Sequence, residues 1–141
     1  MRGVTHLAFG LFIGQLIFII YNAPLALFFA VIGSIFPDID IASSLVGRTS
    51  STHFFFKHRG FFHTFYAAII FSLIISLVNL ICGISFLLGY SSHLLLDSMT
   101  KQGVIFIYGR TKGSLKYGGF FDNAFLFLFV MLNILMLFFY L

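Results

Sequence analysis

Long apolar stretches, broken by two polar segments, set the pattern of this sequence. Asp, Glu, Lys and Arg are absent from residues 3–37, 60–96 and 123–141. A helix needs about 20 largely apolar residues to cross a bilayer, so these stretches have room for several spans. The predicted helices cover residues 4–21, 25–36, 61–81 and 84–99, and a further helix begins at Phe120 or Asp122 and ends at Leu141.

Turn-forming residues mark the breaks between the predicted helices. An Asn-Ala-Pro turn at residues 22–24 separates the first two helices, and its proline suits the start of the second. Pro37 ends the second helix, and Gly83 offers a turn between the third and the fourth. Two polar segments rich in small residues, 42–52 and 101–119, are predicted to be loops.

The composition indicates a membrane protein. Of the 141 residues, 60% are hydrophobic and only 9% are charged, and the mean hydropathy is +1.09. In a soluble domain about a quarter of the residues are charged. We therefore expect an all-α fold, in which residues 1–141 form one integral membrane bundle of about five transmembrane helices.

The basic residues are expected at one end of this bundle. If successive helices alternate in direction, the N-terminus and both polar segments share one side. That side holds Arg2, Arg48, Lys57, Arg59, Lys101, Arg110, Lys112 and Lys116. Because cytoplasmic loops are enriched in Lys and Arg, we expect a multi-pass protein of the cell membrane with its N-terminus in the cytoplasm and its C-terminus outside. The net charge of +4 then fits loops that meet anionic membrane lipids, and no nucleic-acid partner is expected.

The same side gathers histidine and aspartate side chains, which are scarce in this chain. The candidates for a site among them are, in chain order, His6, Asp38, Asp40, His58, His63, His93, Asp97 and Asp122. Ionisable residues within membrane segments are energetically costly and usually serve a function. Their convergence predicts a polar His/Asp site at the cytoplasmic end of the bundle.

The spacing and chemistry of these side chains suit metal ligands. His93 and Asp97 are four residues apart and share one helix face, close enough to chelate one ion. His58 and His63 would diverge by about 140° on a single helix, so we expect His58 on the preceding loop. The candidate ligands are His6, Asp38, Asp40, His58, His63, His93 and Asp97. Imidazole nitrogen together with carboxylate oxygen suits Zn, Mn or Fe.

The number of candidate ligands leaves the number of metal ions open. A closed structural zinc site uses about four ligands. A larger set indicates either two ions, or one ion with supporting residues and an open position for water. Ser92 and Asp122 are the candidate supporting residues. We expect a metal-activated water as nucleophile and Arg59 beside the site to bind phosphate. Asp40 is the first candidate for the general base, with Asp38 as a ligand, but the two could exchange these roles.

Each motif also has a purely structural interpretation. His6 could be an interfacial residue with an ordinary hydrogen bond, and Asp38 with Asp40 could end a helix and solvate a loop. The pair His93 and Asp97 could form a hydrogen bond along its helix, and the neighbouring basic residues could only anchor the topology. The convergence of the motifs on one end of the bundle favours a functional site over these separate structural roles.

Four short motifs follow one another in the order of a known family. They are Thr5-His6 followed by Gly10, Pro37-Asp38-Ile39-Asp40, His58-Arg59-Gly60-Phe61-Phe62-His63, and Gly89-Tyr90-Ser91-Ser92-His93 with Asp97, Thr100 and Gly103. From His6 to about Asp122 the chain resembles the membrane-bound metal-dependent hydrolases, a family that includes a LexA-regulated inner-membrane protein of enteric bacteria. Phe62 and Thr64 replace the usual Thr and Ser of that family, and Asp122 stands where Glu is common.

The resemblance implies a metal-dependent hydrolase in a bacterial or archaeal membrane. Together with the residues above, it predicts hydrolysis of an ester or phosphoester, and a site at headgroup depth favours a lipid-like substrate such as a phospholipid or a polyprenyl phosphate. The alternatives are a metal-stabilised structural or stress protein and an ion transporter. Transport needs a polar path, yet the opposite helix halves offer only Gln15, Ser72, Ser76 and Asn79. The oligomeric state is left open.

Overall fold

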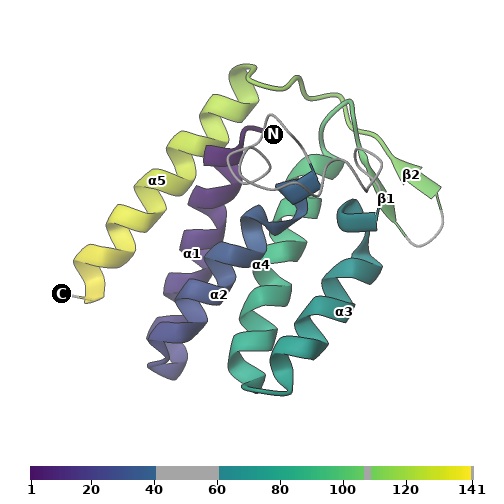
Figure 1. The fold of residues 1–141 in the computed structure, drawn as a ribbon. Coiled ribbons are helices and arrows are strands. Elements are labelled where there is room, and N and C mark those ends of the chain that lie inside the picture. Colours follow the sequence, from purple (N-terminus) through teal and green to yellow (C-terminus); the bar gives the residue numbers. More distant parts are fainter. Residues whose placement is uncertain (41–60, 107–108, 141) are drawn as a thin grey trace.

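Figure 1 shows the computed structural model of the protein. It describes residues 1–40, 61–106 and 109–140, with backbone alone at Asp40, Ile105, Phe106 and Arg110. In these ranges the α-helices are α1 (Gly3–Tyr21), α2 (Pro24–Ile35), α3 (Phe65–Ser76), α4 (Leu80–Ser98) and α5 (Phe120–Tyr140). Short 3₁₀ turns extend α2 at Phe36–Asp40 and precede α3 at Phe61–His63. The predicted all-α bundle is confirmed.

Three of the described helices are long and apolar enough to cross a membrane. These are α1 and α4, with 19 residues each, and α5, with 21 residues. The helices α2 and α3 have only 12 residues each. They span about 18 Å at 1.5 Å per residue, less than a hydrocarbon core of roughly 30 Å. The five predicted helices are therefore present, but two of them are short.

The boundary between α3 and α4 differs from the prediction. α3 ends at Ser76 and α4 begins at Leu80, so the turn lies before Gly83 and not at it. The cause is Asn79, whose side-chain oxygen accepts a hydrogen bond from a backbone N–H in the first turn of α4. Gly83 lies inside α4, where a side chain would overlap Ser76 of α3.

The second polar segment, predicted as a loop, contains a small antiparallel hairpin. Its strands are β1 (Val104–Phe106) and β2 (Gly109–Thr111). The Val-Ile-Phe run has a high strand propensity, and Val104 is buried against the bundle. One apolar residue thus ties an otherwise polar segment to the helices.

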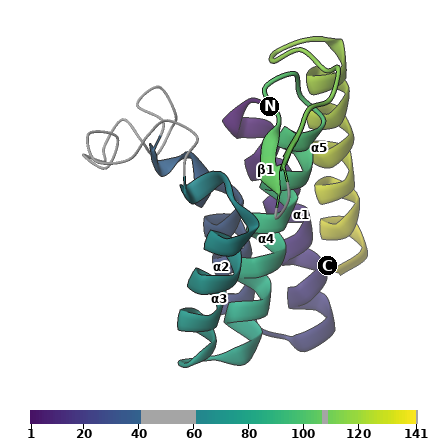
Figure 2. The ribbon, with the colours of Figure 1, turned by 90° about the vertical axis from the view of Figure 1, so that its right-hand side faces the viewer.

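The helix α4 occupies the centre of the bundle. It packs against α1, α2 and α3, whereas α5 packs on α1 at the edge (Figures 1 and 2). Successive helices alternate in direction (Figure 1). One end of the bundle therefore collects the starts of α1, α3 and α5 and the ends of α2 and α4; we call it the site end.

The backbones of α2 and α4 touch where they cross. A Cβ atom at Gly89 of α4 would overlap the carbonyl oxygen of Ala30, and one at Gly33 of α2 would overlap the backbone of α4. Small residues at a helix crossing allow such an approach in a membrane, where association depends on close packing. Because Ser34 and His93 lie within about one turn of this crossing, it also brings these two residues together.

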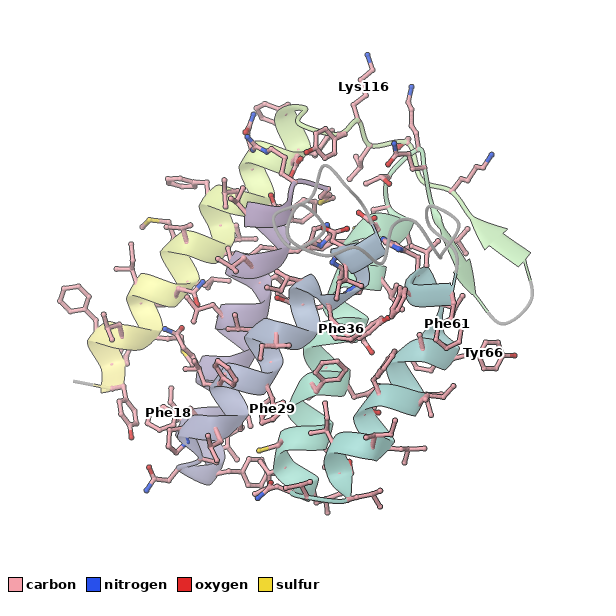
Figure 3. All side chains as sticks on the ribbon, viewed as in Figure 1. Phe18, Phe29, Phe36, Phe61, Tyr66 and Lys116 are labelled. Carbon is pink, nitrogen blue, oxygen red and sulfur yellow. The ribbon has the colours of Figure 1, made fainter. Side chains whose placement is uncertain are left out.

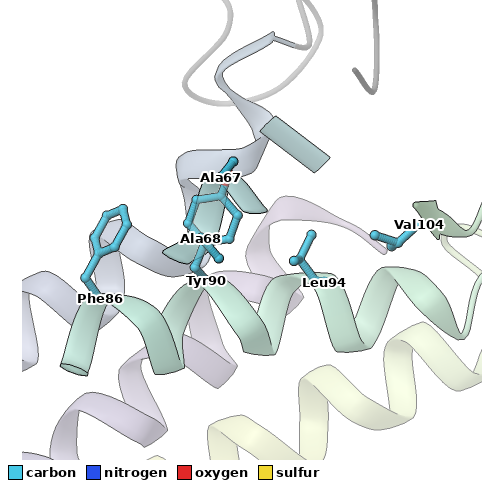
Figure 4. Packing of buried hydrophobic residues seen from close by; sticks show 6 residues of the cluster. All are labelled: Ala67, Ala68, Phe86, Tyr90, Leu94 and Val104. Atoms are coloured by element: carbon cyan, nitrogen blue, oxygen red, sulfur yellow. The ribbon is translucent and has the colours of Figure 1, made fainter. Parts of the chain in front are cut away.

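A buried hydrophobic cluster orients α4. Large side chains on one face of α4 meet small residues of α3 and one residue of β1 (Figure 4). The cluster consists of Ala67, Ala68, Phe86, Tyr90, Leu94 and Val104. With this face held against α3, His93 is left to contact α1 and α2.

Candidate metal centre

Five polar side chains meet in the interior of the site end. The start of α1 supplies His6, the two 3₁₀ turns supply Asp38 and His63, and α4 supplies His93 and Asp97. The three histidines and Asp97 are at most 1% exposed, and the Asp38 side chain is 15% exposed. Such burial of ionisable groups is rare unless they are paired or bind a metal.

The nitrogen and oxygen atoms of these side chains point at one another. His6 Nε2 lies 3.3 Å from Asp97 Oδ1. His93 Nε2 lies 3.6 Å from Asp38 Oδ1 and 3.9 Å from Asp97 Oδ2. His63 Nε2 lies 3.7 Å from Asp38 Oδ1 and 4.0 Å from Asp97 Oδ2. Within the described ranges, the three residues His6, His93 and Asp97 form one group of potential ligands, and Asp38, His63 and His93 form another.

His93 belongs to both groups, and its orientation is determined by α2. Its Nδ1 lies 2.8 Å from the backbone carbonyl oxygen of Ser34. A carbonyl oxygen can only accept, so Nδ1 carries the proton, and in the neutral imidazole Nε2 then carries a lone pair. This Nε2 is buried and has no hydrogen-bond partner among the described residues. A histidine that donates its other ring N–H to a carbonyl is the usual arrangement of a metal ligand.

His6 is stacked on His93. The two ring centroids are 3.8 Å apart and the ring planes differ by 16°. Both ring nitrogens of His6 are buried; Nε2 faces Asp97 Oδ1 at 3.3 Å, and Nδ1 makes no hydrogen bond to any residue the structure describes. A buried polar atom without a partner is costly. A cation bound beside Asp97 would satisfy the Nε2 atoms of both rings.

Asp97 faces both groups with different oxygens. Its Oδ1 is on the side of His6 and also contacts the amino group of Met1. Its Oδ2 is on the side of His63 and His93. This carboxylate can therefore contribute to either group or bridge the two.

Asp38 lies in the 3₁₀ turn that follows α2. Burial raises the pKa of its carboxyl group, but the interaction with His63 and the neighbouring imidazoles of His93 and His6 lower it more. The pKa therefore lies below its ordinary value of 3.8. At neutral pH this side chain is a carboxylate, the form that binds a metal ion.

Tyr90 holds the turn that carries His63. Its ring is fully buried, and its hydroxyl group donates a hydrogen bond of 2.5 Å to the carbonyl oxygen of Phe62. The sequence analysis did not single out Tyr90 or Ser34 as supporting residues. A tyrosine in a membrane helix one turn before His93 was an available signal, because a buried hydroxyl group needs a partner.

Asp122 lies beside the centre and supports it from outside. Its carboxylate accepts hydrogen bonds from the Thr5 hydroxyl group (2.7 Å), from the Gly118 N–H (2.8 Å) and from the Arg2 N–H (3.1 Å). It thereby joins the start of α5 to the start of α1, next to His6. Ser92, the other expected supporting residue, donates to the Gly89 carbonyl oxygen in its own helix at 2.6 Å.

Three of the expected site residues are outside the described parts of the structure. His58 and Arg59 fall in the segment 41–60, and for Asp40 only the backbone is described. The roles expected for them, as ligand, phosphate-binding residue and general base, stay predictions.

The described donor set fits a transition-metal ion. Nitrogen and oxygen ligands at about 2.0–2.2 Å from one ion lie roughly 3.0–3.6 Å from each other. The observed separations of 3.3 Å to 4.0 Å are close to this range. Three imidazoles and two carboxylates, with one imidazole already oriented by a carbonyl oxygen, suit Zn, Mn or Fe.

Comparison with models of protein families gives a match over nearly the whole chain. The family model described as "YdjM inner membrane protein" matches residues 1–140. Neither the curated proteins nor the solved structures contain a significant match.

Proposed function

Because the chain belongs to the YdjM inner membrane protein family, we propose that its histidine–carboxylate centre makes it a membrane-bound, metal-dependent hydrolase. The substrate is an ester or phosphoester of lipid-like character, and the reaction takes place at the cytoplasmic face of the membrane. The observation that carries this proposal is the buried Nε2 lone pair of His93, which is aimed at two carboxylates and has no hydrogen-bond partner among the described residues.

The metal would be held by His6, Asp38, His63, His93 and Asp97. His93 would have one available lone pair, because Nδ1 is protonated, so it could be a ligand of one ion only. A second ion would have to share Asp97, whose two oxygens face different histidines. One or two divalent ions of Zn, Mn or Fe therefore suit the centre.

A divalent ion in such a centre provides a Lewis acid and makes water a stronger nucleophile at neutral pH. The protein contributes the arrangement around it. Ser34 and Tyr90 hold His93 and His63 in place, and the nearly complete burial of the ligands excludes bulk water. Asp38, being ionised, and Asp97 balance the positive charge. Asp40 as general base and Arg59 as phosphate-binding residue remain parts of the proposal.

The position of the centre supports a lipid-like substrate. The ligands lie at the ends of apolar helices, at the depth where lipid headgroups meet hydrocarbon. The segment between α4 and α5 crosses this same end (Figure 1), and the described lysines, Lys101, Lys112 and Lys116, belong to it. Positive charge favours the cytoplasmic side, so we place the N-terminus in the cytoplasm and the C-terminus outside.

Transport of ions is a weaker alternative. Of the polar residues at the opposite end, Ser72 and Ser76 donate hydrogen bonds to backbone carbonyl groups of their own helix, and Asn79 caps α4. These three groups are engaged in local structure. Gln15, the fourth, has a buried side-chain oxygen without a hydrogen-bond partner in the described ranges, but a single such residue does not extend the centre into a path.

Metal content is the decisive measurement. The protein purified in detergent should contain Zn, Mn or Fe in stoichiometric amount by plasma mass spectrometry, and His93→Ala and Asp97→Ala should lose it. Ser92→Ala is the matched control, because its hydroxyl group bonds within its own helix. Wild-type protein that stays empty after reconstitution with these ions would refute the proposal.

A second step separates an enzyme from a metal-stabilised structural protein. A hydrolase stripped with a chelator should lose turnover of phospholipids or polyprenyl phosphates while its helical content persists. Loss of fold without any measurable turnover in the loaded protein would indicate a structural metal.

A further inference from the structure

A pocket opens beside the candidate metal centre, at the site end. Its volume is about 170 Å³. The segment just after α4 forms one wall, with Thr100, Lys101 and Gln102, and the segment before α5 forms the other, with Leu115, Lys116 and Tyr117. None of these pocket residues is a candidate ligand of the metal.

Two residues connect the pocket to the centre. Met1 lines the pocket, and its amino group contacts Asp97. Thr100 also lines it, and the Thr100 hydroxyl group donates a hydrogen bond of 2.8 Å to the backbone carbonyl oxygen of Asp97. The pocket therefore adjoins Asp97 through Met1 and Thr100.

The charge of the pocket is positive and uncompensated. Lys101 and Lys116 are both exposed, and neither forms an ion pair with an acidic side chain in the described ranges. The nearby backbone carbonyl groups are already used: that of Met99 accepts from the Leu115 N–H, and that of Thr100 accepts from the Gly113 N–H. The two ammonium groups are thus available for an anion from outside.

The pocket lies just beyond the ends of two helices that are long and apolar enough to cross a membrane. Both of its walls begin within a few residues of a membrane-spanning helix, since α4 ends at Ser98 and α5 begins at Phe120. Lys116 stands on the segment before α5, beyond the end of the helices (Figure 3). Tyr117 beside it is 67% exposed, as is usual for tyrosines at the membrane interface.

We propose that this pocket binds the phosphate group of the substrate through Lys101 and Lys116. The inference rests on the proposed hydrolase function and narrows its substrate to phosphate-bearing molecules. A phosphate with two negative charges pairs with two ammonium groups, while Leu115 and Tyr117 offer apolar contact to the adjoining glycerol or chain. The phosphate can belong to a lipid headgroup or to a soluble molecule.

Binding can be measured without turnover. The metal content of the full-length protein in a neutral detergent is determined first, and the protein is then titrated by calorimetry with three probes. They are dihexanoyl phosphatidic acid, inorganic phosphate and uncharged dihexanoylglycerol. We expect phosphatidic acid to bind and dihexanoylglycerol not to bind. The double variant K101Q/K116Q should bind phosphatidic acid at least about tenfold more weakly.

The chain offers a matched control for charge. Lys112 is exposed on the same segment but does not line the pocket, so Lys112→Gln should leave the affinity within about twofold of wild type. The variant K101R/K116R keeps both charges and should retain binding. Thermal unfolding checks that the exposed substitutions leave the fold intact.

The outcomes separate this inference from the proposed function. Binding of inorganic phosphate but not phosphatidic acid supports phosphate recognition and assigns the pocket to soluble phosphoesters. If wild type and K101Q/K116Q bind phosphatidic acid with equal affinity, the proposed role of the two lysines is refuted, even if the protein contains metal. The same holds if Lys112→Gln weakens binding as much as K101Q/K116Q does. If binding depends on the two lysines but the protein cannot hold metal, the phosphate pocket is supported and the proposed metal-dependent hydrolase function is refuted.

Discussion

The Nδ1 atom of His93 donates a hydrogen bond of 2.8 Å to the backbone carbonyl oxygen of Ser34. This bond joins α4 to α2 near the point where Gly33 and Gly89 allow the two backbones to touch. It directs Nε2 of His93 towards Asp38 and Asp97. The geometry of the candidate metal centre thus depends on how closely two helices pack.

Gly89→Ala tests this dependence. The added Cβ atom would overlap the carbonyl oxygen of Ala30, so α2 and α4 must separate and the His93–Ser34 bond must lengthen or break. We expect a destabilisation of about 1–3 kcal/mol and a weaker affinity for metal, measured by thermal unfolding and metal titration. Gly119→Ala, where the nearest atom is 3.2 Å away, should change both much less. Equal effects in the two variants would contradict the argument.

Asp38→Asn tests whether metal binding needs the negative charge of Asp38, in the 3₁₀ turn that follows α2. Asparagine keeps the shape of the side chain but removes the charge and one carboxylate oxygen. We expect metal affinity to fall at least about tenfold, measured by competition with a fluorescent chelator. Ser92→Ala should bind metal like the wild type, since the Ser92 hydroxyl group is used within α4. Unchanged affinity in Asp38→Asn would remove this residue from the ligand set.

Asp122→Asn tests the attachment of α5 to α1. Its carboxylate accepts three hydrogen bonds. In asparagine, the side-chain NH₂ group would face at least one of these three donor groups and could not accept its hydrogen bond. We expect a loss of about 1–3 kcal/mol in the free energy of unfolding, with metal still bound by the folded protein. Asn123→Ala is the control, because Asn123 makes only an exposed contact with Arg2. A loss of metal without a loss of stability would instead indicate a direct role for Asp122.

Tyr90→Phe tests the support of His63. Without the hydroxyl group, the hydrogen bond from Tyr90 to the buried carbonyl oxygen of Phe62 is lost, at a cost of about 0.5–1.5 kcal/mol. We also expect weaker metal binding, because the turn that carries His63 is no longer held. Tyr66→Phe, at a residue that is 53% exposed, should change neither the unfolding temperature nor the metal affinity. The prediction fails if both tyrosine variants behave alike.

The apolar pattern was sufficient to predict the five helices and the end of the bundle at which the polar residues meet. Chain direction reverses at each turn, so every second turn returns to the same side of the membrane. For this reason His6, Asp38, His63, His93 and Asp97 could be assigned to one level before any contact was known. The turn after α3 was misplaced, because the cap at Asn79 outweighs the flexibility of Gly83.

Only the tertiary structure decided which atoms face one another. The stacking of His6 on His93, the bond to Ser34 and the support from Tyr90 all depend on the rotation and separation of neighbouring helices. A hydrophobic pattern cannot specify these quantities in a membrane, because lipid and protein interior are similarly apolar. They follow instead from contacts between small residues, such as that of Gly89 with Ala30. Sequence alone therefore determined the end of the bundle at which the candidate site lies, and packing determined its geometry.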